Sequence, residues 1–135
     1  MKYNNLKLVY AIRGNRGPIV NRENAETIVK WADKIGLKEI IATLSRSHTT
    51  EKDRVKEEEV KVFKEVMQNA GINVVIYDEL YDAIKKAIRE VGKDDVILLA
   101  GCQGMDYGAK VALEIIRELN PDIDTKSYLN HYKIE

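Results

Sequence analysis

Two arginines and two glycines lie together where the first apolar run of the sequence ends, in Arg13-Gly14-Asn15-Arg16-Gly17. Glycine lets backbone N–H groups approach an anion, and a guanidinium pairs with phosphate or carboxylate through two parallel hydrogen bonds. We therefore predict that this loop contacts an anionic ligand. The alternative is a tight turn whose arginines are solvated. The loop is not a known nucleotide fingerprint, because it lacks G-x-G-x-x-G and the whole sequence lacks G-x-x-x-x-G-K-[ST].

A second group of cations lies in the long polar segment Ser45–Arg54. Long connections are often functional, and Arg46, His48 and Arg54 could all reach a negatively charged ligand. The alternative is a solvated connector whose serines and threonines cap the next helix. The other histidine, His131, lies in the tail, so no metal-ligand spacing exists and we predict no metal site.

A glycine-rich segment, Gly101–Gly108, follows the most apolar run of the sequence. Its cysteine, Cys102, could act as a nucleophile if it lies at a helix amino terminus, where the pKa of a thiol falls. No base is evidently paired with it, so a buried structural thiol is the favoured interpretation. Asp106 is predicted to cap the final helix.

The hydrophobic period alternates regularly between strand-like and helix-like along the sequence. We expect a helix from about Arg22 to Ile35, with Asn21 as its N-cap and Gly36 as its C-terminal stop. Asp78 is predicted to cap a later helix. The remaining expected elements are strands at 6–12, 39–44, 72–77 and 96–100, helices at 57–70, about 80–91 and up to 119, and a short edge strand near 127–129 in an ambiguous tail.

This order predicts an α/β fold, a Rossmann-like three-layer sandwich around a mostly parallel sheet, in one domain over residues 1–135. Right-handed crossovers bring the strand-to-helix loops to one edge of such a sheet. Ligands bind at that edge, where the strand order reverses. The three polar loops should therefore meet there.

Composition excludes several classes of protein. Lysine plus arginine and aspartate plus glutamate number 22 each, so the formal net charge is zero, and a general nucleic-acid binder is disfavoured. One cysteine cannot form an internal disulfide, which fits a reducing compartment. No apolar run approaches the roughly 18 residues of a membrane span, and Met1–Asn5 is not typical of a signal peptide. We expect a cytoplasmic protein without membrane contact.

The order of these motifs resembles the carboxyl-terminal domain of the Mur ligases. The resemblance covers roughly Leu6 to Leu119 and includes the run Asp94-Asp95-Val96-Ile97-Leu98-Leu99-Ala100-Gly101. In the family's G-D-R loop, Arg16 aligns and Asn15 replaces the aspartate. Arg46 aligns with the arginine of an asparagine-proline-arginine loop whose first two residues are missing. The family's A-G-K-G-H-E-D-Y aligns with residues 100–107, where the lysine, histidine and glutamate are lost.

Mur ligases use ATP to activate a carboxylate as an acyl phosphate, which an incoming amine then attacks. In the family, a central domain carries the P-loop and the magnesium site, and the carboxyl-terminal domain helps to hold nucleotide and amino acid. The resemblance implies nucleotide contacts from Arg13, Asn15, Arg16 and Asp106. It implies amino-acid contacts from the Ser45–Arg54 and Gly101–Gly108 loops, namely Arg46, His48, Arg54 and Gln103. ATP and Mg²⁺ would be shared through the central domain, and no residue here would be catalytic.

Two departures limit what these 135 residues can do. They contain neither the central ATPase domain nor the D-Y-A-H-N-P segment that opens the family's last domain, so the chain should not ligate anything alone. It is either a fragment of a longer ligase or a free-standing remnant that binds a ligand or a partner. Two alternatives stay open: an interaction module that docks or self-associates through an exposed apolar surface, and a small enzyme that uses Cys102.

Overall fold

The computed structural model describes residues 4–122. Strands and helices alternate along this part of the chain, which confirms the predicted α/β class. Three short 3-10 turns interrupt the loops: η1 (Arg46–His48), η2 (Glu51–Asp53) and η3 (Gln103–Met105). The main elements are β1 (Leu6–Ala11), α1 (Gly17–Ile35), β2 (Glu39–Thr43), α2 (Glu57–Asn69), β3 (Asn73–Tyr77), α3 (Leu80–Glu90), β4 (Val96–Gly101) and α4 (Gly108–Leu119).

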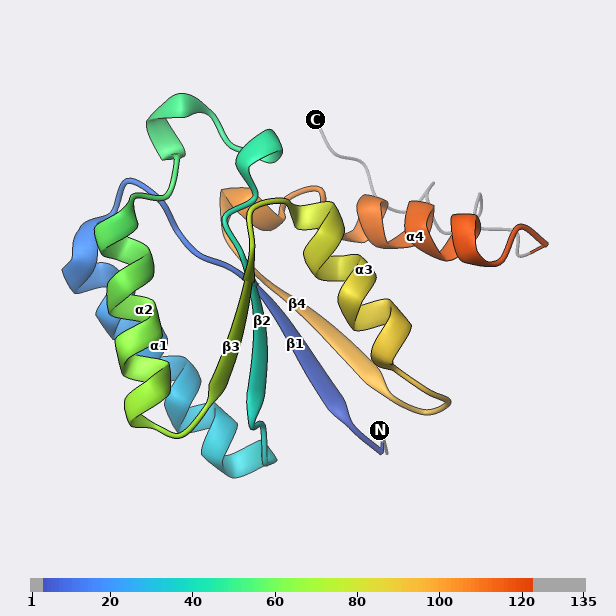
Figure 1. Ribbon diagram of the computed structural model, residues 1–135, viewed down its shortest axis with the longest axis horizontal. Coiled ribbons are helices and arrows are strands. Elements are labelled where there is room, and N and C mark those ends of the chain that lie inside the picture. The colour runs from blue at the N-terminus through green and yellow to red at the C-terminus, as the bar shows by residue number, and fades with distance from the viewer. Residues whose placement is uncertain (1–3, 123–135) are drawn as a thin grey trace.

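All four strands are parallel, and their order across the sheet is β3-β2-β1-β4. Helices α1 and α2 pack together on one face, and α3 and α4 pack on the other (Figure 1). The chain steps from β1 to β3 in one direction and then crosses back to β4. A right-handed crossover in the opposite direction requires the opposite face, which explains the position of α3. The three-layer arrangement is as predicted.

The central strands β1 and β2 are buried on both faces, as is typical of parallel sheets covered by helices. Along β1, Leu8 and Tyr10 face α1 and α2, whereas Val9 and Ala11 face α3 and α4. The Tyr10 ring stacks on the fully buried Phe63 of α2, with 5.4 Å between ring centroids and 9° between ring planes. These two layers fix the position at which β1 leaves the sheet.

The start of α1 differs from the prediction. The helix begins at Gly17, and Asn21 lies inside its first turns, fully buried, rather than at the N-cap. Pro18 fits this earlier start because its missing N–H would have had no helical partner there. The predicted stop is confirmed, since Gly36 ends the helix in the left-handed conformation with φ 70°.

Two predicted side-chain caps are wrong. Glu79 and Tyr107 occupy the N-cap positions of α3 and α4, and neither makes a capping hydrogen bond through its side chain. Instead, the backbone carbonyl oxygen of Asp78 accepts a hydrogen bond from the backbone N–H of Arg46, at 3.0 Å. Asp106 ends the η3 turn and is exposed. The edge strand expected near 127–129 lies outside the described residues. No helix within residues 4–122 is long and apolar enough to cross a membrane.

Candidate functional site

The loops after β1 and β4 leave the sheet side by side, at the point where the strand order reverses. Ala11 pairs with Gly101 at the carboxyl ends of these strands. The approach is close, because a Cβ at Gly101 would lie 2.9 Å from the Ala11 Cβ, and Gly101 has a φ of 136° that favours glycine. We define this junction, with residues 12–16 and 102–107, as the switch edge.

The second polar loop folds against the first. A Cβ at Gly14 would lie 2.0 Å from the carbonyl oxygen of Asp53, so only glycine allows the backbones to come this close. This contact brings the backbone of Arg54 beside residues 13–17, which we call the arginine loop, although the Arg54 side chain is exposed. The predicted meeting of these two loops is therefore confirmed at the level of the backbone.

Ser45 ties the end of β2 to the η3 turn. The residue is fully buried and adopts a left-handed conformation with φ 49°. Its hydroxyl donates to the carbonyl oxygen of Gly104 at 2.5 Å, and its backbone N–H donates to the Thr43 hydroxyl oxygen at 3.0 Å. Since η3 contacts both η1 and the end of β1, Ser45 holds the glycine-rich loop in place between them.

Four polar side chains gather around the end of β1 on the side of α1. Burial raises the pKa of the Tyr10 hydroxyl, and the nearby Cys102 thiol raises it further, whereas Arg13 and Asn24 lower it. Arg13 is half-buried, and its Nε is buried without a hydrogen-bond partner among residues 4–122. The switch edge therefore holds a guanidinium whose hydrogen-bonding capacity is not fully used.

Cys102 is exposed, so the interpretation of a buried structural thiol is wrong. The residue lies directly after β4, an edge strand of the described sheet. Cys102 precedes the short η3 turn and does not lie at the start of α4, which begins at Gly108. Cys102 is therefore an exposed residue of the switch edge.

Arg46 and His48 lie on η1, over the β3–α3 connection rather than beside Arg13. The Arg46 Nε is 3.6 Å from an Asp78 carboxylate oxygen. The His48 ring lies 5.1 Å from the Tyr107 ring, tilted by 32°. The structure thus divides the predicted residues into an arginine-loop group and an η1 group, and the exposed Gln103 of η3 lies between them.

Two backbone N–H groups where the arginine loop enters α1 are already occupied. Asn15 turns the loop in a left-handed conformation with φ 57°, and both Asn15 and Arg16 have exposed side chains. The N–H groups of Arg16 and Gly17 donate to a carboxylate oxygen of Glu59, at 3.3 and 3.1 Å. An external anion would therefore meet the arginine side chains and not the helix end.

Sequence reasoning missed Tyr10, Ser45 and Glu59, which shape this edge. Glu59 looks like one member of a charged helix start, and only its position three residues after Lys56 indicates a capping box. Nothing in the local sequence distinguishes Ser45 from the solvated residues that follow it. Tyr10 reads simply as an apolar strand residue.

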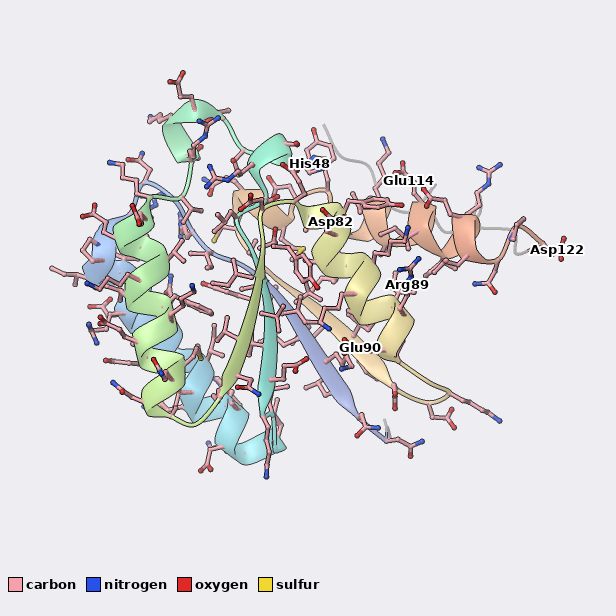
Figure 2. All side chains as sticks on the ribbon, in the orientation of Figure 1. His48, Asp82, Arg89, Glu90, Glu114 and Asp122 are labelled. Atoms are coloured by element: carbon pink, nitrogen blue, oxygen red, sulfur yellow. The ribbon has the colours of Figure 1, made fainter. Side chains whose placement is uncertain are left out.

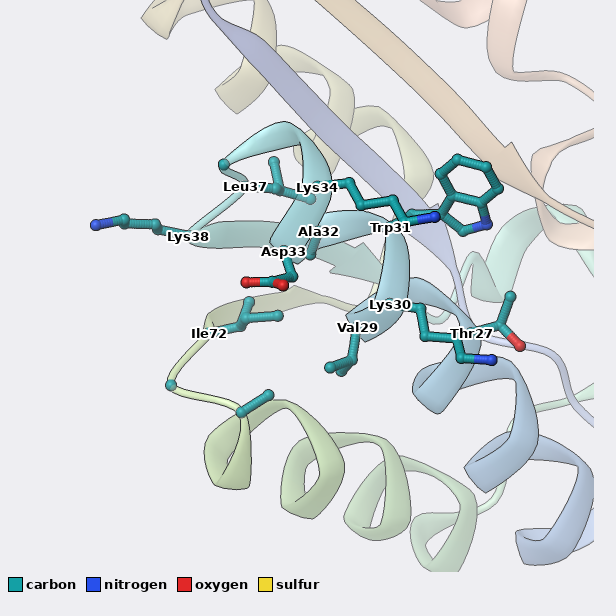
Figure 3. Close-up of a pocket in the computed structure, with 13 residues that line it drawn as sticks. Thr27, Val29, Lys30, Trp31, Ala32, Asp33, Lys34, Leu37, Lys38 and Ile72 are labelled. Atoms are coloured by element: carbon teal, nitrogen blue, oxygen red, sulfur yellow. The ribbon is translucent and has the colours of Figure 1, made fainter.

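A large hollow lies elsewhere in the described part of the chain. It is open, with a volume of about 1030 Å³, and is formed by the end of α1 and by the turns that lead into β2 and β3 (Figure 3). This is the amino end of the sheet, opposite the switch edge. Its lining includes Lys30, Lys34 and Trp31, with the Lys34 ammonium 5.0 Å from the Trp31 ring centroid. No polar groups converge in it from the loops described above.

Within residues 4–122, no group of three or more histidine, cysteine, aspartate or glutamate side chains is placed to hold a metal ion. No protein-family model matches the sequence, and no curated protein matches it either. The geometry of the switch edge therefore has to support any functional proposal by itself.

We predict that Gly14→Ala lowers the free energy of unfolding by about 1–3 kcal/mol, because the new methyl group would overlap the Asp53 carbonyl. Gly92→Ala is the matched control, since its nearest neighbour would be the Asp95 carboxylate at 3.9 Å. Urea denaturation followed by circular dichroism measures both. Equal stability of the two variants would contradict the loop contact.

Tyr10 should make the protein less stable in alkali. Because its pKa is raised in the folded state, the neutral hydroxyl favours folding, and this contribution is lost as pH rises above 10.0 through the folded pKa. Urea denaturation at pH 9 and at pH 11 should show a smaller loss of stability for Tyr10→Phe than for the wild type. The same loss in both proteins would show that Tyr10 does not carry this dependence.

Proposed function

We propose that this chain is an anion-binding domain of the kind found at the carboxyl terminus of Mur ligases, and that it binds the phosphate of a nucleotide or the carboxylate of an amino acid at the switch edge. The observation that best supports this proposal is the reversal of strand order between β1 and β4, because open parallel sheets bind their ligands at such a point. Both loops that follow these strands carry residues of the expected chemistry.

Arg13 and Arg16 are the residues that best support binding. Arg16 is exposed and Arg13 is half-buried, and neither guanidinium forms a salt bridge within residues 4–122. A guanidinium in such a position gains a charge-assisted hydrogen bond when an anion arrives. In contrast, Arg46 already has Asp78 beside it, so we assign it, with His48, to a second and weaker contact region.

The proposal assigns no ligase activity to these residues alone. No P-loop sequence is present to hold the transferred phosphate, and the side-chain donors at the switch edge include the arginines and the amides of Asn15 and Gln103. Such groups orient and neutralise an anion, whereas acyl-phosphate formation also needs a second substrate and a magnesium-bound phosphate chain. A central ligase domain would supply these, with ATP shared between the two domains.

A second candidate function is supported by exposed apolar side chains. Leu98 pairs with the core residue Leu8 and therefore faces the same layer as α1, yet it is 49% exposed. Trp31 of α1 is 60% exposed. Because β4 is an edge strand of the described sheet, its exposed face around Leu98 would suit association with a second copy of the chain.

Titration of the ¹⁵N-labelled protein with ATP, and separately with glutamate, tests the anion-binding proposal. We expect shifts of the backbone amides of residues 13–17 and 101–107. Arg13→Ala and Arg16→Ala should each weaken binding by roughly tenfold or more, the loss expected for one charge-assisted hydrogen bond. Arg89→Ala, on the exposed end of α3, is the control for net charge (Figure 2). No shift at millimolar ligand, or an equal loss in Arg89→Ala, would refute the proposal.

Light scattering at increasing protein concentration tests the second candidate. The wild type should show a concentration-dependent rise in mass that Leu98→Lys abolishes, because a charge would be buried at the contact. Leu119→Lys replaces another exposed leucine, on α4, and is the control. A wild-type protein that stays monomeric at millimolar concentration would exclude self-association through this surface.

A further inference from the structure

The most completely buried charged side chain in the described structure belongs to Glu59, whose exposed fraction is 0%. One carboxylate oxygen accepts hydrogen bonds from the N–H groups of Arg16 and Gly17, at 3.3 and 3.1 Å, and from the Asn21 side-chain amide at 2.8 Å. The other oxygen accepts from the N–H of Lys56 at 3.0 Å. Four neutral donors thus surround one buried anion.

This donor set is the one that a bound anion meets in other α/β proteins. Two of the N–H groups belong to the start of α1, where unpaired donors and the helix dipole favour negative charge. A third belongs to the start of α2. A buried carboxylate without such hydrogen bonds would be very costly, so the donors and the carboxylate depend on one another.

A capping box explains only part of this arrangement. In a capping box the glutamate bonds the N–H of its own N-cap residue, here Lys56. The carboxylate oxygen that does not contact Lys56 accepts a hydrogen bond from the N–H of Gly17, at the start of α1 and 42 residues away in the sequence. Asn21 strengthens the same junction, because its amide also donates to the carbonyl oxygens of Arg13 and Gly17, both at 3.0 Å.

We propose that Glu59 is an internal anion that fills the anion site at the start of α1 and holds the backbone of the arginine loop. It is a positioning residue for the anion-binding function proposed above, on which this second role rests. Arg13 and Arg16 are left to receive the external ligand. Removal of the Glu59 side chain should therefore create a small site for formate, whose carboxylate matches the one that is lost.

The test uses Glu59→Ala, with Glu58→Ala as the matched control because Glu58 is the exposed neighbour on the same helix. Each protein is titrated with sodium formate and, at equal ionic strength, with sodium chloride. In Glu59→Ala, formate should shift the amide signals of Arg16, Gly17 and Lys56 saturably and raise the melting temperature. The wild type and Glu58→Ala should show neither effect, and chloride should not replace formate.

A folded Glu59→Ala protein without a saturable formate response would overturn the internal-anion role. Glu59→Gln provides a second test that keeps the size of the side chain. It should shift the same three amides and lower the melting temperature, and a wild-type spectrum and melting temperature in this variant would equally overturn the role of the charge.

Measuring ATP binding distinguishes the internal-anion role of Glu59 from the anion-binding function, on which only its positioning role rests. Glu59→Ala should bind ATP roughly tenfold more weakly than the wild type, and formate should restore most of the loss. If the wild type does not bind ATP or glutamate, the anion-binding function fails, while the formate response still decides the internal-anion role. If the wild type binds ATP and Glu59→Ala binds it equally well, the positioning role alone is refuted.

Discussion

The handedness of parallel crossovers is the constraint on which the rest of this structure depends. The chain builds β1, β2 and β3 in one direction with α1 and α2 on one face, and must then cross the sheet to add β4 beside β1. A right-handed connection in that direction leaves α3 on the opposite face, and α4 follows it. The reversal places the carboxyl end of β4 beside that of β1, so the arginine loop and the glycine-rich loop are neighbours although about 90 residues separate them in the sequence.

Close backbone approaches then convert this edge into a defined surface. Gly14 admits the second loop, and Gly104 lies against Ser45 and the end of β1, where a Cβ would come within 3.1–3.2 Å of its neighbours. The buried Ser45 hydroxyl and Glu59 carboxylate hold these loops in place, because their hydrogen bonds go to backbone or amide groups of the loops and helix starts. The guanidiniums above this framework are the groups that remain for an external anion.

The sequence predicted the layers well because they depend on local patterns. Apolar runs and helix-like periods located the four described strands and four helices, and Gly36 marked the end of α1 correctly, although α1 begins at Gly17 and not near Arg22. The internal construction of the edge depends on contacts between distant residues, which no local pattern records. Asn21 looks like an N-cap until Glu59, 38 residues away, is seen to bond it. Cys102 looks like a core thiol until β4 is found at the edge of the described sheet.

The central claim is that an anion binds between the loops after β1 and β4 and contacts the arginine side chains. Glu59 meanwhile stays bound to the N–H groups at the start of α1. A crystal structure of the protein soaked with tungstate, a heavy analogue of phosphate, tests it most directly through the anomalous signal of tungsten. The account predicts one strong site within hydrogen-bonding distance of the Arg13 and Arg16 guanidiniums, with Glu59 undisplaced. A site at the N–H groups of Arg16 and Gly17 with Glu59 expelled, or a sole site in the hollow at the amino end of the sheet, would contradict it.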